Sequence, residues 1–187
     1  MQKLAVFNSV TLDSYFTGKN GDMSWAYAGS DDPEFREFTA GNASGGGTLL
    51  LGRKTYEMMA CYWPTPAAKK AYPAVAEGMD RLQKIVFSRT LERADWSNTT
   101  VARGDLATEV RRLKEGSGEG LVLLGSGSIV SQLTREGLID EYQLVVTPVV
   151  LGEGRTMFDG LEKTLSLVLT KSRAFRNGKV FLCYARS

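Results

Sequence analysis

The stretch LLLGRKTYEMM, residues Leu49–Met59, decides the fold because it joins two kinds of secondary structure without a linker. Its apolar run is typical of a strand that is buried on both faces of a parallel sheet. Gly52, the adjacent cations Arg53 and Lys54, and then Thr55 follow this run, and helix-forming residues come next. The stretch therefore predicts a strand that opens directly into a helix, with two positive charges at the junction.

Outward from this stretch, strands and helices alternate along the whole chain. Apolar runs predict strands at residues 3–10, 48–52, 84–88, 120–125 and 140–152, and periodic patterns predict helices at 34–41, from 53, at 105–116 and at 126–137. Segments 165–175 and 179–186 flank Asn177-Gly178, a strong hairpin signal. We therefore expect a single domain over residues 1–187, an α/β fold with a mainly parallel central sheet flanked by helices and a C-terminal antiparallel hairpin.

The composition argues against several kinds of partner. The chain has 187 residues with 23 basic and 21 acidic side chains, and its cations are dispersed, so we expect no nucleic-acid partner. No apolar run has the length of a membrane span, so we expect no membrane partner. Cys61 and Cys183 form no CxxC pair, which favours a reducing, cytoplasmic location.

The chain contains no histidine, which limits its chemistry. Serine–histidine hydrolysis, histidine general-base catalysis and most zinc sites are excluded, and we expect no metal. Proton transfer is then left to carboxylates, tyrosines, lysines, backbone groups and water. A bound cofactor that carries the chemistry is therefore favoured.

Three predicted strand ends carry residues that suit phosphate groups. The first is a helix N-terminus with two cations, the second a serine–arginine pair, and the third a glycine-rich turn that opens a helix. These candidate residues are Gly52, Arg53, Lys54, Thr55, Ser88, Arg89, Gly125, Ser126, Gly127 and Ser128. Each loop also has a purely structural explanation: a solvated helix start, an ordinary turn, or a tight turn with a serine cap.

Together the loops indicate a particular ligand. Two phosphate sites on different strand ends suit a molecule that has a pyrophosphate and a further phosphate monoester. NADPH fits this description, and no acidic residue of the kind that binds the ribose of NADH lies in these loops.

These residues resemble the dihydrofolate reductase-like superfamily, which includes the RibD C-terminal domain, the reductase domain of bacterial riboflavin biosynthesis. The similar segments are LGRKTYE, VFSR, LLGSGSIVSQL, GKNGDMSW and LVVTPVVLGEGRTMF. The resemblance implies that Arg53 binds the 2′-phosphate and that Thr55 lies at the pyrophosphate. It also implies that Ser88 and Arg89 lie near the adenosine phosphate. It places Gly125–Ser128 beneath the nicotinamide and pyrophosphate, and it implies a homodimer.

The same resemblance implies the substrate side of the site. Met23 and Trp25 would belong to a mobile loop that closes over nicotinamide and substrate, and Thr147 would face the substrate pocket. Phe35, with Trp25 and Thr147, would shape that pocket. The segments AGNASGGGT and PTPAAKKAYPAVAEG fit neither branch of the superfamily closely, and the second would lie along the pocket rim.

Three aspartates are the candidate catalytic residues. Asp31 or Asp32 lies near the position of the pterin-binding carboxylate of folate reductases, although its spacing from Trp25 is longer by one or two residues. TLDSYF resembles the SLDG segment of riboflavin-type reductases, which would place Asp13 at the substrate. A helix cap for the first two and a strand-end turn for Asp13 are the structural alternatives.

We therefore expect an NADPH-dependent reductase that transfers hydride to an electron-poor carbon of a C=N bond or a sugar carbonyl. The substrate would be a small heterocyclic molecule: a pterin, a ribosylamino-pyrimidine or a compound unrelated to either. One alternative is a nucleotide-binding module without catalysis. A second is a phosphotransferase, which would need an acidic metal-binding pair beside a glycine loop.

Overall fold

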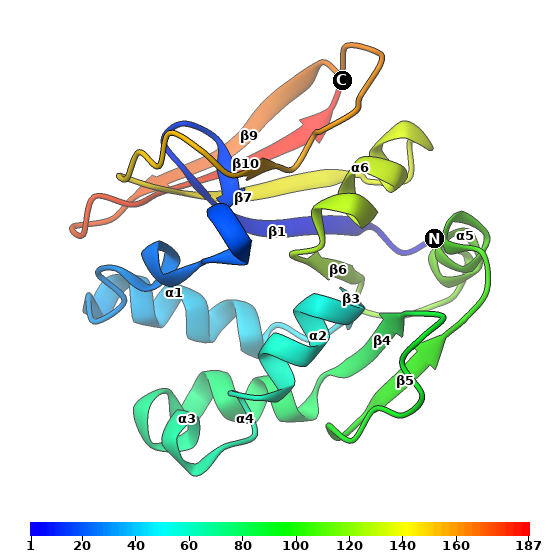
Figure 1. Ribbon diagram of the computed structural model, residues 1–187, viewed down its shortest axis with the longest axis horizontal. Helices are drawn as coiled ribbons and strands as arrows, with labels where there is room; N and C mark the ends of the chain where they lie inside the picture. The colour runs from blue at the N-terminus through cyan, green and yellow to red at the C-terminus, as the bar shows by residue number, and fades with distance from the viewer.

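The computed structural model describes residues 1–187 and contains one eight-stranded sheet, in the order β5-β4-β3-β6-β1-β7-β10-β9 (Figure 1). Its strands are β1 (Leu4–Thr11), β3 (Thr48–Gly52), β4 (Gln83–Phe87), β5 (Thr99–Ala102), β6 (Leu121–Leu124), β7 (Glu141–Thr147), β9 (Leu167–Ala174) and β10 (Val180–Arg186). The helices are α1 (Pro33–Ser44), α2 (Arg53–Ala60), α3 (Pro66–Ala71), α4 (Pro73–Arg81), α5 (Leu106–Glu115) and α6 (Gly127–Arg135). Two short 3-10 helices, η1 (Lys19–Gly21) and η2 (Ser24–Tyr27), and a small ribbon of β2 (Tyr15–Thr17) with β8 (Arg155–Thr156) complete the chain.

The sheet is parallel except at one edge. β1 lies between β6 and β7 and is parallel to both, and β3, β4 and β5 continue the parallel part. β10 is antiparallel to β7 and to β9. The predicted fold, a mainly parallel sheet with a C-terminal antiparallel pair, is confirmed. Parallel pairing brings the carboxyl ends of β1, β3, β6 and β7 to one edge, where ligands bind in sheets of this kind.

One predicted strand is shorter than expected. The apolar segment 140–152 forms a strand only to Thr147. Pro148 follows, and it has no N–H with which to continue a ladder. Beyond it the chain turns, and the carbonyl of Val149 accepts the N–H of Leu12 at 2.9 Å. The end of β7 is therefore tied to the loop after β1.

The segment between β3 and β4 contains more structure than the sequence pattern indicated. α3 and α4 begin at Pro66 and Pro73, where the fixed φ of proline suits a first helical turn. The Thr65 hydroxyl caps α3 by accepting the N–H of Ala68 at 3.2 Å. β5 is a four-residue edge strand, and no apolar run in the sequence predicted it. These two helices and this strand are additional to the elements that the sequence predicted.

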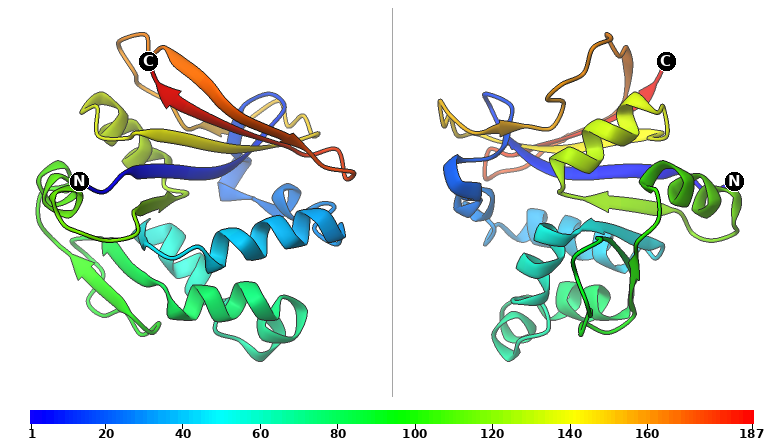
Figure 2. Two further views of the ribbon diagram at one scale, coloured as in Figure 1. Left: turned by 180° about the vertical axis from the view of Figure 1, so that it is seen from behind. Right: turned by 45° about the vertical axis from the view of Figure 1, so that its right-hand side comes forward.

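Helices cover both faces of the sheet (Figure 2). α5 and α6 pack on one face, where Leu50, Leu123 and Val130 belong to the largest apolar core. α2 and α4 pack on the other face, in a core that contains Leu51 and Met79. Consecutive residues of β3 therefore point to opposite cores, as the period of a strand requires. None of the helices is long and apolar enough to cross a membrane.

A buried lysine closes the C-terminal end of α4. Lys84 of β4 is 1% exposed, and its Nζ donates to the carbonyls of Met79 and Leu82, both at 2.6 Å. The ring centroid of Trp96 lies 4.5 Å from this Nζ. Burial lowers the pKa of Lys84 to about 8, and the carboxylate of Asp80 opposes that shift. The ammonium thus satisfies carbonyls that a helix end leaves without partners.

Replacing Lys84 by methionine is expected to lower the free energy of unfolding by about 2–3 kcal/mol, because buried carbonyls lose their donor. Lys69 is the matched control, since it pairs with Asp80 at 3.0 Å but is exposed. Its replacement by methionine should cost less than about 1 kcal/mol. Urea unfolding of both variants measures the difference, and equal losses would contradict the helix-closing role of Lys84.

Candidate functional site

A cavity of about 1900 Å³ lies over the face of the sheet that α1, α2 and α4 cover. Phe7, Val122 and Leu124 form part of its floor and are only half-buried, whereas Val6 and Leu123 on the opposite face are fully buried. Central strands of a parallel sheet are normally covered on both faces. The uncovered floor therefore indicates a ligand site, and its volume exceeds the roughly 300–1,000 Å³ of an ordinary small-molecule pocket. The predicted cofactor residues in its wall are Gly52, Lys54, Thr55, Gly125, Ser126, Gly127 and Ser128.

Two of the predicted loops are joined at this cavity. The Ser126 hydroxyl accepts the Gly52 N–H at 2.9 Å and lies 2.9 Å from the Thr55 hydroxyl. A Cβ added to Gly52 would lie 2.5 Å from Ser126 Oγ, and one added to Gly125 would lie 2.8 Å from Thr55 Oγ1. Gly125 also has a φ of +59°, which other residues rarely adopt. The close approach of the two loops therefore depends on glycine at both positions.

Both loops open into helices whose first N–H groups have no side-chain cap. α2 follows Gly52 and α6 follows Ser126, and neither N-cap residue bonds to its helix through a side chain. In contrast, Asp32 and Asp105 cap α1 and α5. Free N–H groups and the helix dipole attract anions, and Lys54 adds a cation to the cavity wall beside α2. This rim therefore combines two anion-attracting helix ends.

Asn8 supports the glycine loop from beneath, and the sequence reasoning missed it. This buried side chain accepts the N–H of Gly125 at 2.7 Å through Oδ1. Its Nδ2 donates to the sulfur of Met157 at 2.9 Å. The sequence did contain a signal for this role, because Asn8 is an amide that follows four apolar residues in β1, LAVFN. A buried polar residue needs a partner, and here that partner is the backbone of the site.

The remaining predicted cofactor residues, Arg53, Ser88 and Arg89, lie at the same edge of the sheet but outside the cavity wall. The parallel register pairs Gly52 with Phe87, so that Arg53 and Ser88 leave neighbouring strands at the same level. The structure therefore brings the first and second predicted loops side by side.

The local contacts of these residues are those of exposed loops. The Arg53 guanidinium pairs with Glu57 one helical turn later, at 3.1 Å, and both side chains are exposed. Such a pair contributes little to stability, so the guanidinium can exchange partners. The Ser88 hydroxyl accepts the N–H groups of Thr90 and Leu91 and shapes the turn after β4.

The predicted substrate residues are divided between the wall and the layer behind it. Met23 and Phe35 line the cavity, whereas Trp25 and Thr147 do not and are 7% and 1% exposed. The Nε1 of Trp25 and the Oγ1 of Thr147 are buried without a hydrogen-bond partner, as is the hydroxyl of Thr17, which lines the cavity. Unpartnered buried polar groups are rare in proteins and call for an explanation. Of the three, Thr17 belongs to the cavity wall, where a polar ligand or a water would supply its partner.

Asp13 holds a loop together. Its Oδ2 accepts the N–H groups of Leu151 and Gly152 at 3.0 and 2.8 Å, and its Oδ1 accepts the Thr11 hydroxyl at 2.6 Å. The Thr11 hydroxyl, followed by the Gly152 N–H, lowers the pKa of Asp13 below its usual value. The carboxylate is therefore an ionised acceptor that ties the loop after β1 to the loop after β7, and it lies outside the cavity wall.

The other two candidate aspartates also lie outside the wall. Asp32 caps α1 by accepting the N–H of Phe35 at 2.8 Å, and Asp31 is exposed. The carboxylates that do line the cavity are Glu119 and Glu153. A proton-transfer role for the aspartates thus stays a prediction, and any such transfer would need an intervening water.

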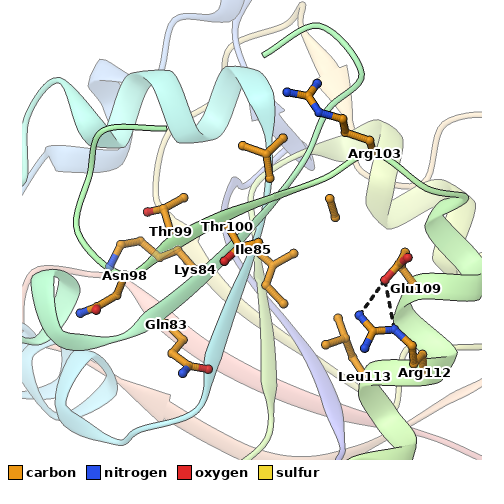
Figure 3. A pocket seen from close by; sticks show the side chains of 12 residues that line it. Gln83, Lys84, Ile85, Asn98, Thr99, Thr100, Arg103, Glu109, Arg112 and Leu113 are labelled. Carbon is orange, nitrogen blue, oxygen red and sulfur yellow. Dashed lines mark hydrogen bonds and ion pairs between the residues drawn. The ribbon is translucent and has the colours of Figure 1, made fainter. Parts of the chain in front are cut away.

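A second cavity, of about 600 Å³, lies on the opposite face between α5 and the strands β4 and β5 (Figure 3). Figure 3 shows Arg112 of its wall paired with Glu109, at 2.9 Å. None of the predicted site residues lines it. The larger cavity is therefore the candidate functional site. No group of three or more Asp, Glu, Cys or His side chains is arranged to hold a metal ion.

Glycine loops and uncapped helix ends lie around the large cavity of this α/β sheet, an arrangement that suits an anionic ligand. The chain belongs to the family of the RibD C-terminal domain, whose family model matches residues 2–181. It is 30% identical to the protein YyaP of Bacillus subtilis over 176 residues, which are 94% of this chain and 90% of that protein. It is 27% identical to YwjB of the same organism, over 100% of this chain and 99% of that protein.

Crystal structures of related proteins show the same fold. A putative riboflavin biosynthesis protein from Shewanella sp. PV-4 has a TM-score of 0.74 at 22% identity, with 100% of this chain and 99% of that chain covered. A pyrimidine reductase-like protein from Corynebacterium diphtheriae has a TM-score of 0.66 at 13% identity, with 100% and 92% covered. A deaminase/5-amino-6-(5-phosphoribosylamino)uracil reductase from Thermotoga maritima has a TM-score of 0.67 at 14% identity, and the match spans 100% of this chain and 57% of that one.

Replacing Asn8 by leucine, a residue of similar size without an acceptor, is expected to speed amide exchange at Gly125 about tenfold, because the N–H loses a buried partner. Ser9→Ala in the same strand is the control and should leave the exchange of Gly125 unchanged. Hydrogen exchange followed by NMR gives both rates. An unaltered rate in the Asn8 variant would show that this amide does not hold the loop.

Proposed function

We propose that this protein is an NADPH-dependent reductase that transfers hydride to a small heterocyclic substrate. The observation that carries the proposal is the joined pair of loops, Gly52–Thr55 and Gly125–Ser128, on the rim of a cavity large enough for a dinucleotide and a second molecule. Membership of the RibD C-terminal domain family supports reductase chemistry. Two free cysteines fit a reducing cytoplasm as its location.

The residues present fit the proposed cofactor. The uncapped ends of α2 and α6 suit a pyrophosphate, and glycine at positions 125 and 127 lets the loop pack closely against Thr55 and Phe16, which holds the start of α6 at the cavity rim. Arg53 and Arg89, beyond the cavity wall, would bind the 2′-phosphate that distinguishes NADPH from NADH. When bound, NADPH supplies the hydride.

The chain contributes alignment, exclusion of water and a route for a proton. Met23 covers the cavity from the loop that carries η1 and η2, and Trp25 and Thr147 support the wall from behind, where a bound water would satisfy their unpartnered polar groups. A proton would come from Asp13 or from one of Asp31 and Asp32 through water, because none of the three lines the cavity. The acceptor bond is a C=N bond or a sugar carbonyl.

The position of the three aspartates also supports a second candidate function. A module that binds NADP(H) without catalysis needs the phosphate loops but no acid in the cavity. Mixing the protein with NADPH and either dihydrofolate or a ribosylamino-pyrimidine phosphate, intact or dephosphorylated, separates the two functions. Oxidation of NADPH with any acceptor supports the reductase, and tight binding without oxidation supports the module.

Arg53→Ala and Arg89→Ala are each expected to raise the Kd for NADPH about ten- to a hundredfold and to leave the Kd for NADH nearly unchanged, because NADH lacks the phosphate that the guanidinium binds. Arg93→Ala, which removes an exposed arginine paired with Asp95, is the control. Calorimetric titration with both nucleotides at one salt concentration measures the preference. If both variants keep the preference of the original protein, the arginines are not a phosphate clamp.

Trp25→Ala is expected to lower turnover at least about tenfold while changing the Kd for NADPH by less than about threefold, because the residue belongs to the loop proposed to cover the reacting ring and not to the phosphate loops. Trp25→Phe keeps the apolar bulk but removes the unpartnered N–H. Lower turnover in both variants assigns the effect to the N–H of Trp25. Lower turnover in the alanine variant alone assigns it to the apolar bulk of the side chain. A parallel loss of turnover and NADPH affinity would refute the placement.

A further inference from the structure

Residues 18–30, which we call the cover, form one side of the large cavity and precede α1 in the chain. Met23 and Ala26 of the cover line the cavity. The main-chain hydrogen bonds of the cover are local, because the N–H groups of Ala26, Ala28 and Ser30 each donate to a carbonyl three residues earlier. Such bonds do not fix the cover relative to the sheet. Contacts with other elements must therefore hold it over the cavity.

A buried lysine of the C-terminal hairpin makes such a contact. Lys179, at the turn between β9 and β10, is 1% exposed, and its Nζ donates to the carbonyl of Ala26 at 2.6 Å. The same Nζ lies 4.6 Å from the ring centroid of Phe35, an α1 residue in the cavity wall. One side chain therefore contacts both the cover and the helix that follows it.

The turn of the hairpin makes a second contact with the cover, and Figure 1 shows this turn beside the segment that precedes α1. The Nδ2 of Asn177 donates to the carbonyl of Gly29 at 2.8 Å, and its Oδ1 accepts the N–H of Lys179 at 3.0 Å. Gly29 has a φ of +67°, and a Cβ added to it would lie 3.0 Å from the Cβ of Asn177. The ring of Phe175 packs edge to face on Phe35 at 5.2 Å. The turn thus holds the cover at two carbonyls and α1 at one ring.

The surroundings of Lys179 are unusual for a buried charge. Its Nζ donates to one carbonyl only, and none of the ion pairs of the protein includes it. Burial lowers the pKa of Lys179 below its usual value, and no carboxylate opposes that shift. In contrast, Lys84 donates to several carbonyls and has Asp80 nearby. A buried ammonium costs free energy that an apolar side chain would not, so the bond to the cover is what this lysine contributes.

We infer that Lys179 is a positioning residue that fastens the cover over the cavity, with Asn177 as the second point of the clamp. The clamp is a property of the folded protein and requires no ligand. Its consequence for catalysis rests on the proposed function, since a fastened cover keeps water away from the carbon that receives the hydride.

Lys179→Met keeps most of the length of the side chain and removes its N–H groups. In the protein without ligand, exchange of the Ala26, Ala28 and Ser30 amides is expected to become at least about tenfold faster, because the cover opens more often. Exchange of the β7 amides should stay within about twofold of the original rate. Lys171→Met, which removes an exposed ammonium from β9 of the same hairpin, is the control and should leave all these rates unchanged.

Asn177→Asp tests the second contact without disturbing the turn, because the carboxylate still accepts the N–H of Lys179 but cannot donate to the carbonyl of Gly29. It should speed exchange of the three cover amides at least about threefold, and it decides the matter alone if Lys179→Met does not fold. Unaltered exchange of the cover amides would overturn the inference. Equal acceleration in the cover and in β7 would also overturn it, because that result shows only a general loss of stability.

Turnover separates this inference from the proposed function. With NADPH and an acceptor, Lys179→Met should lower kcat at least about fivefold and leave the Kd for NADPH within about threefold, because the phosphate loops are untouched. Faster exchange of the cover with an unchanged kcat would overturn the positioning role. If the original protein does not bind NADPH, the proposed function fails while the exchange rates still decide whether the clamp exists.

Discussion

The hydroxyl of Ser126 is the contact on which the site depends. It accepts the N–H at the end of β3 and meets the Thr55 hydroxyl in the first turn of α2, so that one side chain joins the loops after two adjacent strands. The joint requires glycine at positions 52 and 125, because a Cβ at either would collide with the hydroxyls. It leaves the starts of α2 and α6 without side-chain caps and next to one another. A pair of free helix N-termini is an electrostatic arrangement that suits two linked phosphates.

The rest of the fold places this joint beside an open floor. Parallel pairing of β3, β6 and β1 sets their carboxyl ends level, and α1 and α2 leave part of the central strands uncovered. On the face beneath, residues of α5 and α6 pack against the central strands β1, β3 and β6. Asn8 then ties the glycine loop to that packed core through β1. The cavity therefore lies where the helices leave one face of the central strands uncovered. The other face of the same strands is packed against helices.

Local patterns in the sequence were enough for most of the fold and for the two joined loops. The junction at Gly52 and the turn at Gly125 follow apolar runs directly, so strand, loop and helix are all encoded within about ten residues. Contacts between residues far apart in the chain could not be predicted from such local patterns. The partner of Asn8 is 117 residues away, and nothing near Asp13 in the chain shows that its carboxylate holds residues 151 and 152. The ring contacts of Trp63 with Tyr62 and Tyr72, in the turn after α2 and just before α4, likewise lie in a segment that had no recognisable pattern.

The central claim is that the joined loops bind NADPH, and hydrogen exchange of the whole chain with and without NADPH tests it most directly. The account predicts slower exchange at residues 52–55 and 125–128 on addition of NADPH, with strand β9 unaffected because it lies at the far edge of the sheet. Slower exchange confined to β4, β5 and α5, around the smaller cavity, would contradict the account. So would the absence of any change at the two loops at saturating NADPH.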